Sequence, residues 1–310
     1  MYSHNKDIVC MGEAMVEFTR IESQKDDALY IRGLGGDTSN CAIAAARQGA
    51  DVAYLSAVGE DQFGRIAMEK WSDEGIDVSH VSIDPDAPTG IYFIEPAPEG
   101  RNFTYYRNDS AATKMTLSDA SHSLLSRTAI LHISAITQAI SSAARGSAFN
   151  AIEIVKQSGG KVSYDTNLRL NLWGLEEARS VINETAAKAD ILLPSLDEAQ
   201  TLTGLDNKDD ILEFYLKFKP EILVLKCASE GAIVVCGGEK KFIPALEVSA
   251  VDTSGAGDTF AGAFLARIVQ GESPFEAARF AVVAAGISVK GYGAVTPIPN
   301  RKQVLKALAN

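Results

Sequence analysis

The sequence predicts a doubly wound α/β domain with a small β lid. Short apolar runs typical of buried strands alternate with helical segments along most of the chain. Two glycine-rich turns, at residues 33–40 and 251–258, each lead into a helix. No low-complexity tract, linker or repeat divides the sequence, so we expect a single domain over residues 1–310.

The composition argues against several classes of partner. A formal net charge of −11 disfavours nucleic acid, because phosphate backbones bind to basic surfaces. No apolar run approaches the roughly 20 residues of a membrane span, and residues 1–7 lack the apolar stretch of a signal peptide. We therefore expect a cytoplasmic protein that does not bind membranes. The four cysteines and four histidines lack metal-ligand spacing, which disfavours a zinc site.

The first elements alternate between strand and helix. Residues 8–12 form a short apolar strand that ends at a glycine, and residues 29–31 are a second candidate strand. Glu13 and Glu17 lie between these two segments, and we expect both side chains to solvate a sheet edge. Residues 52–74 follow as a strand, a turn and a helix.

The first glycine-rich turn places small and polar residues before a helix expected at residues 41–47. Glycines let the backbone approach a ligand closely, and Asp37 and Asn40 are candidates to hydrogen-bond ligand hydroxyls. The turn differs from a dinucleotide-binding fingerprint, because no third glycine stands at the helix start. The alternative interpretation is an ordinary helix cap.

A candidate β-hairpin stands apart from the alternation of strands and helices. Residues 89–94 and 102–107 are apolar or aromatic segments joined by a turn that contains proline and glycine. We interpret this hairpin as a lid outside the main sheet. Tyr92, Tyr105 and Arg107 are expected on its exposed side, where they would cover a ligand.

The second half of the chain continues the alternation. Residues 161–165 form a strand, and residues 166–173 form the loop after its carboxyl end. Ligands of open α/β sheets bind at such ends, so Asp165, Asn167 and Arg169 are candidate site residues. Further strands are expected at residues 130–133, 189–194, 221–226 and 232–236, and further helices at residues 143–158 and 275–289.

The second glycine-rich turn carries the clearest chemical signal. Gly255, Ala256 and Gly257 precede Asp258, where a helix begins. Unpaired backbone N–H groups and the helix dipole make such a turn a site for a phosphate or a developing oxyanion. A carboxylate beside it is placed to take a proton from a hydroxyl, which is the chemistry of phosphoryl transfer. The alternative is again an ordinary N-cap.

Together the two turns resemble the two signatures of the ribokinase (PfkB) carbohydrate kinase family. The first is Gly35-Gly36 with Asn40, and the second is Asp-Thr-Ser-Gly-Ala-Gly-Asp at residues 252–258. The resemblance implies a three-layer α/β/α sandwich around a mostly parallel sheet, with lid strands inserted within residues 13–33 and 89–108. It also implies ATP-dependent phosphorylation of a sugar hydroxyl, with Mg²⁺ on the phosphates.

The resemblance assigns roles by position. Asp258 is implied to be the general base, and the N–H groups of residues 255–257 the anion hole. Glu198 matches the glutamate of the family's Asn-x-x-Glu motif, which organises magnesium and phosphate, and Ser195 stands where the family has asparagine. Asp252 is implied to help hold a monovalent cation such as K⁺. The residues implied to contact ATP are Asn167, Ser195, Glu198, Lys226, Gly231, Gly255 and Gly257.

Within the family, the chain is most similar to 2-keto-3-deoxygluconate kinases. A sugar acid carries a carboxylate, and arginine binds a carboxylate through two parallel hydrogen bonds. The resemblance implies that Arg169 holds this carboxylate with help from Arg107; the alternative is that both arginines form surface salt bridges. The residues implied to contact the sugar acid are Gly35, Gly36, Asp37, Asn40, Tyr92, Tyr105, Arg107, Arg169 and Asp258.

Other functions stand as alternatives. A kinase for a neutral sugar, such as fructose or ribose, would use Arg107 and Arg169 to contact hydroxyls or nucleotide. A sensor would bind sugar or nucleotide without turnover, although an intact Asp258 disfavours this reading. A dinucleotide-dependent reductase is disfavoured because no G-x-G-x-x-G motif follows the first strand. Relatives often dimerise through the lid, so we expect a homodimer.

Overall fold

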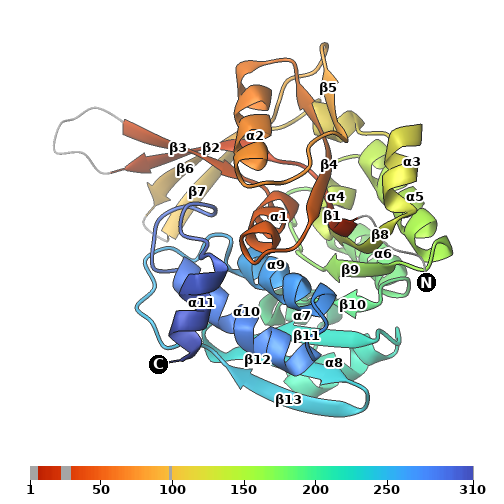
Figure 1. The fold of residues 1–310 in the computed structure, drawn as a ribbon, viewed down its shortest axis with the longest axis vertical. Helices are drawn as coiled ribbons and strands as arrows, with labels where there is room; N and C mark the ends of the chain where they lie inside the picture. Colours follow the sequence, from red (N-terminus) through yellow and green to blue (C-terminus); the bar gives the residue numbers. More distant parts are fainter. Residues whose placement is uncertain (1–5, 22–28, 98–99, 310) are drawn as a thin grey trace.

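The computed structural model describes residues 6–21, 29–97 and 100–309, which fold around a nine-stranded sheet (Figure 1). The strand order is β13-β12-β11-β10-β9-β8-β1-β4-β5, and neighbouring strands from β11 to β5 run parallel. The pairs β11–β12 and β12–β13 are antiparallel. The strands are β1 (Lys6–Met11), β4 (Val52–Gly59), β5 (Val81–Asp84), β8 (Thr128–Ser134), β9 (Lys161–Asp165), β10 (Ile191–Leu192), β11 (Ile222–Lys226), β12 (Gly231–Cys236) and β13 (Glu239–Pro244).

Helices cover both faces of this sheet, because successive side chains of a strand point to opposite faces. In β1, Ile8 and Cys10 pack into one apolar core, and Val9 and Met11 pack into the other. The helices over the first core are α1 (Asp37–Arg47), α2 (Gln62–Asp73), α9 (Ala256–Val269), α10 (Pro274–Ser288) and α11 (Arg301–Leu308). Those over the second are α3 (Asp119–Leu125), α4 (Ala135–Ala139), α5 (Ser142–Gln157), α6 (Leu175–Ala186), α7 (Leu196–Thr203) and α8 (Lys208–Leu216). The expected three-layer α/β/α sandwich is confirmed.

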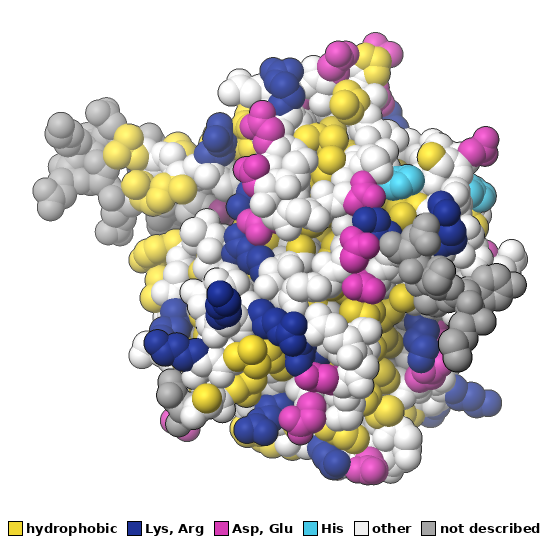
Figure 2. Space-filling model, viewed as in Figure 1, with side chains coloured by type: hydrophobic (Ala, Val, Ile, Leu, Met, Phe, Trp, Pro, Cys, Tyr) yellow, Lys and Arg dark blue, Asp and Glu magenta, His cyan; other side chains and the backbone are white. Residues whose placement is uncertain are grey.

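A separate four-stranded sheet has the order β3-β2-β6-β7. Its strands are β2 (Met15–Ile21), β3 (Leu29–Gly35), β6 (Ile91–Ala97) and β7 (Gly100–Tyr106). The β2–β3 pair projects from the body of the molecule (Figure 1). Hydrophobic side chains are exposed on this projection (Figure 2). The exposed large apolar residues of this pair are Ile21, Leu29, Tyr30 and Ile31.

The helices that follow the two glycine-rich turns cross at close range. A Cβ on Gly262 of α9 would overlap the backbone oxygen of Cys41 in α1, so this crossing requires glycine. Ala44 and Ala45 of α1 lie at the same crossing, where small side chains keep the two backbones close. The contact brings the N-termini of α1 and α9 together at one edge of the large sheet.

Most of the predicted elements are confirmed, and some boundaries differ. Strand β9 occupies the predicted residues 161–165, whereas β10 is confined to Ile191–Leu192. Helix α1 begins at Asp37 instead of Cys41, because Gly36 takes a φ of 126° that ends β3 and lets the chain turn at once. The prediction omitted β5, β13, α3, α4, α6 and α8. Within the described ranges, no helix combines the length and apolar character needed to cross a membrane.

Candidate active site

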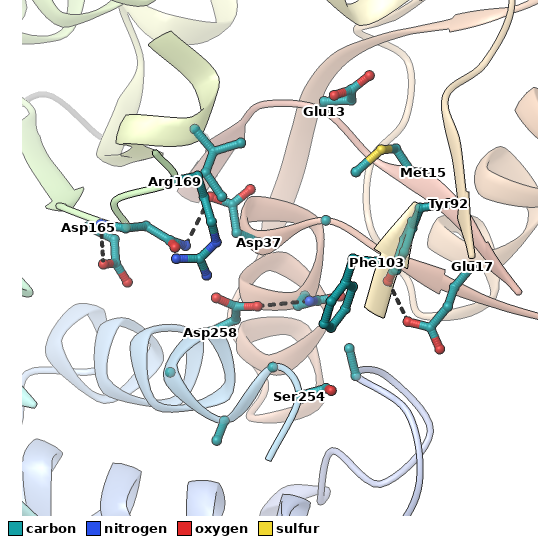
Figure 3. A pocket seen from close by; sticks show the side chains of 18 of the residues that line it. Glu13, Met15, Glu17, Asp37, Tyr92, Phe103, Asp165, Arg169, Ser254 and Asp258 are labelled. Carbon is teal, nitrogen blue, oxygen red and sulfur yellow. Dashed lines mark hydrogen bonds between the residues drawn. The ribbon is translucent and has the colours of Figure 1, made fainter. Parts of the chain in front are cut away.

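Side chains from many elements meet at the carboxyl edge of the large sheet, where the strand order reverses between β1 and β8. Ligands of open α/β sheets bind at such a point. A cavity of about 650 Å³ lies there, bordered by the N-termini of α1 and α9 and by the four-stranded sheet (Figure 3). The predicted site residues that line it are Gly36, Asp37, Asn40, Tyr92, Tyr105, Arg107, Asp165, Asn167, Arg169, Ser195, Glu198, Lys226, Gly255, Ala256, Gly257 and Asp258.

Asp258 lies in the first turn of α9 and lines this cavity. The Nδ2 group of Asn40 donates a hydrogen bond of 2.8 Å to its Oδ2, across a separation of 218 residues in the sequence. The other carboxylate oxygen points away from Asn40 (Figure 3). One oxygen is therefore held by the first glycine-rich motif, and this bond leaves the other oxygen of the cavity-lining carboxylate unengaged.

Burial raises the pKa of Asp258 to about 7, and the negative charges of Asp37 and Asp165 act in the same direction. The hydrogen bond from Asn40 and the positive charge of Lys226 oppose this increase in pKa. A carboxylate with this pKa is a stronger base than an ordinary aspartate and is still largely ionised just above neutral pH.

The turn before Asp258 exposes backbone to the cavity. Gly255 has a φ of 71°, and a Cβ there would lie 3.0 Å from the backbone oxygen of Ala294, so the position requires glycine. A Cβ on Gly257 would meet the Nζ of Lys226 at 3.5 Å. Ala256 N–H donates to the carbonyl oxygen of Thr253 at 3.2 Å, so an anion would compete with this bond. The N-terminal N–H groups and the dipole of α9 favour negative charge at this place.

Asp37 occupies the first position of α1, beside Gly36. Its Oδ2 accepts hydrogen bonds from Ser134 Oγ at the end of β8 and from Asn167 Nδ2 at 3.4 Å. Burial raises the pKa of Asp37 above its ordinary value, and the hydrogen bond from Ser134 opposes this shift. Asp37 thus places a second, partly buried carboxyl group one helical turn from Asn40.

Two ion pairs lie on the side of the cavity formed by β9, β11 and α7. Lys226 Nζ lies 2.5 Å from Asp165 Oδ2, and Arg169 Nη1 lies 2.9 Å from Glu198 Oε1. Burial lowers the pKa of Lys226, but the charges of Asp165 and Glu198 outweigh this effect and raise it, so the ammonium group stays charged. Arg169 keeps 45% of its side chain exposed and is the more accessible of the two cations.

The structure corrects the expectation that Glu13 and Glu17 solvate a sheet edge. Both are buried, at 2% and 4% exposure, and both line the cavity. Glu13 accepts hydrogen bonds from Arg107 and from Ser110 Oγ (2.7 Å), and Glu17 accepts one from the hydroxyl of Tyr92. A signal was present in the sequence: residues 13, 15 and 17 alternate, and all three face the cavity.

Tyr92 and Arg107 also differ from expectation. They were expected on the exposed side of the hairpin, but their side chains are only 7% and 8% exposed. The face of the four-stranded sheet that carries them covers the cavity. Tyr105 is partly buried, and its ring stacks near that of Tyr92, with centroids 5.6 Å apart. The guanidinium of Arg107 lies 5.8 Å from the centroid of Tyr105. The side of the hairpin that carries these residues therefore faces inward.

Three predicted site residues lie outside the cavity lining. A Cβ on Gly35 would overlap the hydroxyl of Tyr92, so this glycine makes room for the tyrosine. Gly231 has a φ of 123° and lets β12 approach β13 closely. Asp252 is buried, and its carboxylate accepts hydrogen bonds from two backbone N–H groups at 3.0 and 2.9 Å. Its expected role in binding a monovalent cation stays a prediction.

Polar atoms of the cavity suit a magnesium nucleotide. Among the residues that the structure describes, Glu198 Oε2 and Asn167 Oδ1 are buried oxygens without a hydrogen-bond partner. A buried polar atom without a partner is costly, so such oxygens mark places where ligand atoms fit. Lys226, next to the Gly257 turn, adds the positive charge that phosphates need.

Comparisons with known proteins agree with this site. Residues 5–301 match the family model described as pfkB family carbohydrate kinase. Fructokinase-1 of Oryza sativa subsp. japonica is 33% identical over 97% of this chain and 97% of its own length. The 2-dehydro-3-deoxygluconokinase of Thermoproteus tenax is also 33% identical, over 97% and 94%.

A solved structure extends the comparison to the fold. The crystal structure of a PfkB protein from Polaromonas sp. JS666 matches with a TM-score of 0.86 and 29% identity, and covers 97% of this chain and 99% of that one. The match of both sequence and fold extends over nearly the whole chain. The protein therefore belongs to the PfkB family of carbohydrate kinases, sugar kinases that use ATP with Mg²⁺.

Proposed function

We propose that the protein phosphorylates the terminal hydroxyl of 2-keto-3-deoxygluconate with ATP. The observation that carries this proposal is the position of Arg169, a half-exposed cation, in the same cavity as the partly buried carboxylate of Asp258. Arg169 would hold the acid end of the substrate, and Asp258 would receive the proton of the reacting hydroxyl. Figure 3 shows the two side chains directed into the same space.

In the proposed mechanism, the chain's own residues position the reactants and move one proton. The sugar hydroxyl donates a hydrogen bond to the free oxygen of Asp258, while Asn40 holds the other oxygen in place. Asp258 accepts the proton as the hydroxyl oxygen attacks the γ-phosphorus of ATP; the bond from that phosphorus to the β-phosphate oxygen breaks, and ADP leaves. The N-terminal N–H groups of α9, from the Gly255–Gly257 turn, stabilise the charge on the transferring group.

Nucleotide and metal would lie beside the turn. Mg²⁺, when bound with ATP, supplies charge neutralisation at the phosphates. Glu198 Oε2 and Asn167 Oδ1 are the partnerless oxygens that would orient it or its water shell, and Lys226 would attract the phosphates. Ser195, the N-cap residue of α7, makes no side-chain cap bond, and its hydroxyl would contact the nucleotide.

We also propose that the four-stranded sheet acts as a lid on a single kinase domain and that its exposed face mediates a homodimer. The β2–β3 pair carries exposed apolar residues, including Leu29 at 48% and Ile31 at 54% exposure. An apolar face of this kind favours association with a second protein surface. Sedimentation velocity of Ile31→Asp should show monomers where the wild-type protein sediments as a dimer; a wild-type monomer would contradict the proposal.

A neutral-sugar kinase is the second candidate, and one observation favours it. Among the described lining residues, each cation already has a carboxylate partner: Arg107 with Glu13, Arg169 with Glu198 and Lys226 with Asp165. Six carboxyl groups but only these three cations occur among the described lining residues, so the cavity has an excess of acidic groups, which suits fructose or ribose better than an acid. In this case Arg169 would contact sugar hydroxyls.

Replacing Arg169 with alanine tests the carboxylate assignment. A charge-assisted hydrogen bond contributes about 1.5–3 kcal/mol, so the Kd for 2-keto-3-deoxygluconate should rise by about 10- to 100-fold. The Kd for fructose should change by less than about threefold, because fructose offers no charge for such a bond. Isothermal titration calorimetry measures both constants.

Arg279→Ala is the matched control, because Arg279 is exposed on α10 and lies outside the cavity. It should leave both dissociation constants unchanged. An Arg169→Ala protein that binds the sugar acid as tightly as the wild-type protein would contradict the assignment.

The raised pKa of Asp258 predicts the pH dependence of the reaction. The base must be deprotonated to act, so kcat/KM should rise with pH through a midpoint near the pKa of about 7 and then level off. Asp37→Asn removes a negative charge that raises this pKa, so the midpoint should move to lower pH. Measurements of kcat/KM from pH 5 to 9 test both the midpoint and its shift. If Asp37→Asn leaves the midpoint unchanged, the charge of Asp37 does not raise the pKa of Asp258.

A further inference from the structure

One ion pair connects the two halves of the cavity. Arg169 comes from the loop after β9, and its guanidinium faces Asp258 and Asp37 on the side proposed for the sugar (Figure 3). Its partner, Glu198, comes from the first turn of α7 and lies near Lys226 on the side proposed for the phosphates. The bond between Arg169 Nη1 and Glu198 Oε1 measures 2.9 Å. This one ion pair thus joins a cation on the side proposed for the sugar to an anion on the side proposed for the phosphates.

Both members of this pair are free to exchange partners. The Arg169 side chain is 45% exposed, whereas its partner is 14% exposed, so the arginine can move with little loss of burial. Besides Glu198, Arg169 Nη1 donates to the carbonyl oxygen of the adjacent Leu168 at 2.7 Å. Glu198 Oε2 is buried without a hydrogen-bond partner within the described part of the chain. Only one of the two carboxylate oxygens of Glu198, Oε1, therefore has a hydrogen-bond partner.

We propose that the Arg169–Glu198 pair couples the two substrates: a sugar carboxylate displaces Glu198 from Arg169, and the released glutamate then binds the magnesium nucleotide more tightly. This inference rests on the proposed function, because it needs a substrate that carries a carboxylate. The exchange replaces one arginine–carboxylate pair by another, so the arginine keeps an anionic partner throughout. No bond is made or broken other than these ionic contacts.

Electrostatics sets the sign of the coupling. While Arg169 holds Glu198, a metal cation must compete with the guanidinium for the same carboxylate. Once the sugar carboxylate neutralises Arg169, the negative charge of Glu198 is available to the metal. Coupling between two binding sites is reciprocal, so the magnesium nucleotide must tighten the sugar acid by the same factor. A neutral sugar leaves the pair intact and gives no such effect.

The test measures nucleotide binding without turnover. Calorimetric titration of the wild-type protein with Mg²⁺ and a non-hydrolysable ATP analogue should give a Kd about tenfold lower in saturating 2-keto-3-deoxygluconate than without sugar. Saturating fructose should change this Kd by less than about twofold. Comparing the acid with the neutral sugar separates the ion-pair exchange from any closure of the lid that both sugars would cause.

Glu198→Gln removes the charge and keeps the shape of the side chain. This variant should bind 2-keto-3-deoxygluconate at least as well as the wild-type protein, because Arg169 no longer has a competing anion, and its coupling factor should fall to about one. Glu177→Gln is the matched control, since Glu177 forms an exposed ion pair with Arg145 outside the cavity. It should keep the full coupling.

The outcomes separate this inference from the proposed function. Phosphorylation of 2-keto-3-deoxygluconate with a wild-type coupling factor near one, or full coupling in Glu198→Gln, overturns the coupling alone. Failure of the wild-type protein to bind the sugar acid overturns both. A tenfold factor that appears with the acid, is absent with fructose and is lost in Glu198→Gln supports both.

Discussion

Asp258→Asn should reduce kcat by about 10³-fold, because a general base contributes about 10²–10⁴-fold to a proton transfer. Asparagine has the size of aspartate and retains an oxygen that can accept the hydrogen bond from Asn40. Its amide cannot take the proton of a sugar hydroxyl. The loss should therefore appear in kcat, with the Kd values of sugar and nucleotide changed little.

A coupled assay of ADP release measures this loss, and calorimetry measures the two dissociation constants. Asp209→Asn is the matched control, since Asp209 also lies in the first turn of a helix, α8, but is exposed and is not among the residues that line the cavity. It should keep full activity. An Asp258→Asn enzyme that retains more than a tenth of the wild-type kcat would show that another group acts as the base.

Glu13→Gln should destabilise the protein by about 3 kcal/mol, because removal of one charge from a buried ion pair leaves the other uncompensated. Arg107 and Glu13 are both buried, and the pair joins the end of β1 to the end of β7. Glutamine can keep the hydrogen bond from Ser110, so the expected loss arises from the charge on Arg107 and not from an empty space.

Urea unfolding followed by circular dichroism gives the free energy of unfolding. Combining Glu13→Gln with Arg107→Gln removes both charges and should recover part of the lost stability. Glu239→Gln is a control on an exposed pair with Lys241, and its effect should stay within about 0.5 kcal/mol. If Glu13→Gln also changes stability by less than about 0.5 kcal/mol, the buried pair is not a stabilising contact.

The alternation of strands and helices was predictable because local patterns carry it. The strand at residues 161–165 is bounded by glycines before it and a polar loop after it, so its limits follow from its neighbours. Strand β13 has five exposed residues among its six, including Lys240 and Lys241, and lies at a sheet edge. No apolar periodicity marks such a strand, and its pairing with β12 depends on tertiary structure.

The candidate site was predictable where its residues lie within short motifs. The Gly255–Gly257 turn and Asp258 are contiguous, and their role as a helix N-terminus follows from local sequence. The partners of Arg107 and Tyr92 were not predictable, because Glu13 and Glu17 lie 94 and 75 residues away in the sequence. Which charges are buried depends on how the four-stranded sheet lies over the cavity, and local patterns do not encode that placement.

The most direct test of the proposed specificity is a comparison of kcat/KM for 2-keto-3-deoxygluconate, fructose and ribose, with ATP and Mg²⁺ present. A carboxylate held by Arg169 should raise kcat/KM for the sugar acid above that of either neutral sugar by about 10- to 100-fold. A higher kcat/KM with fructose or ribose would contradict this account and favour the neutral-sugar kinase. Tight nucleotide binding without turnover of any of the three sugars would also contradict it, and would favour a sensor.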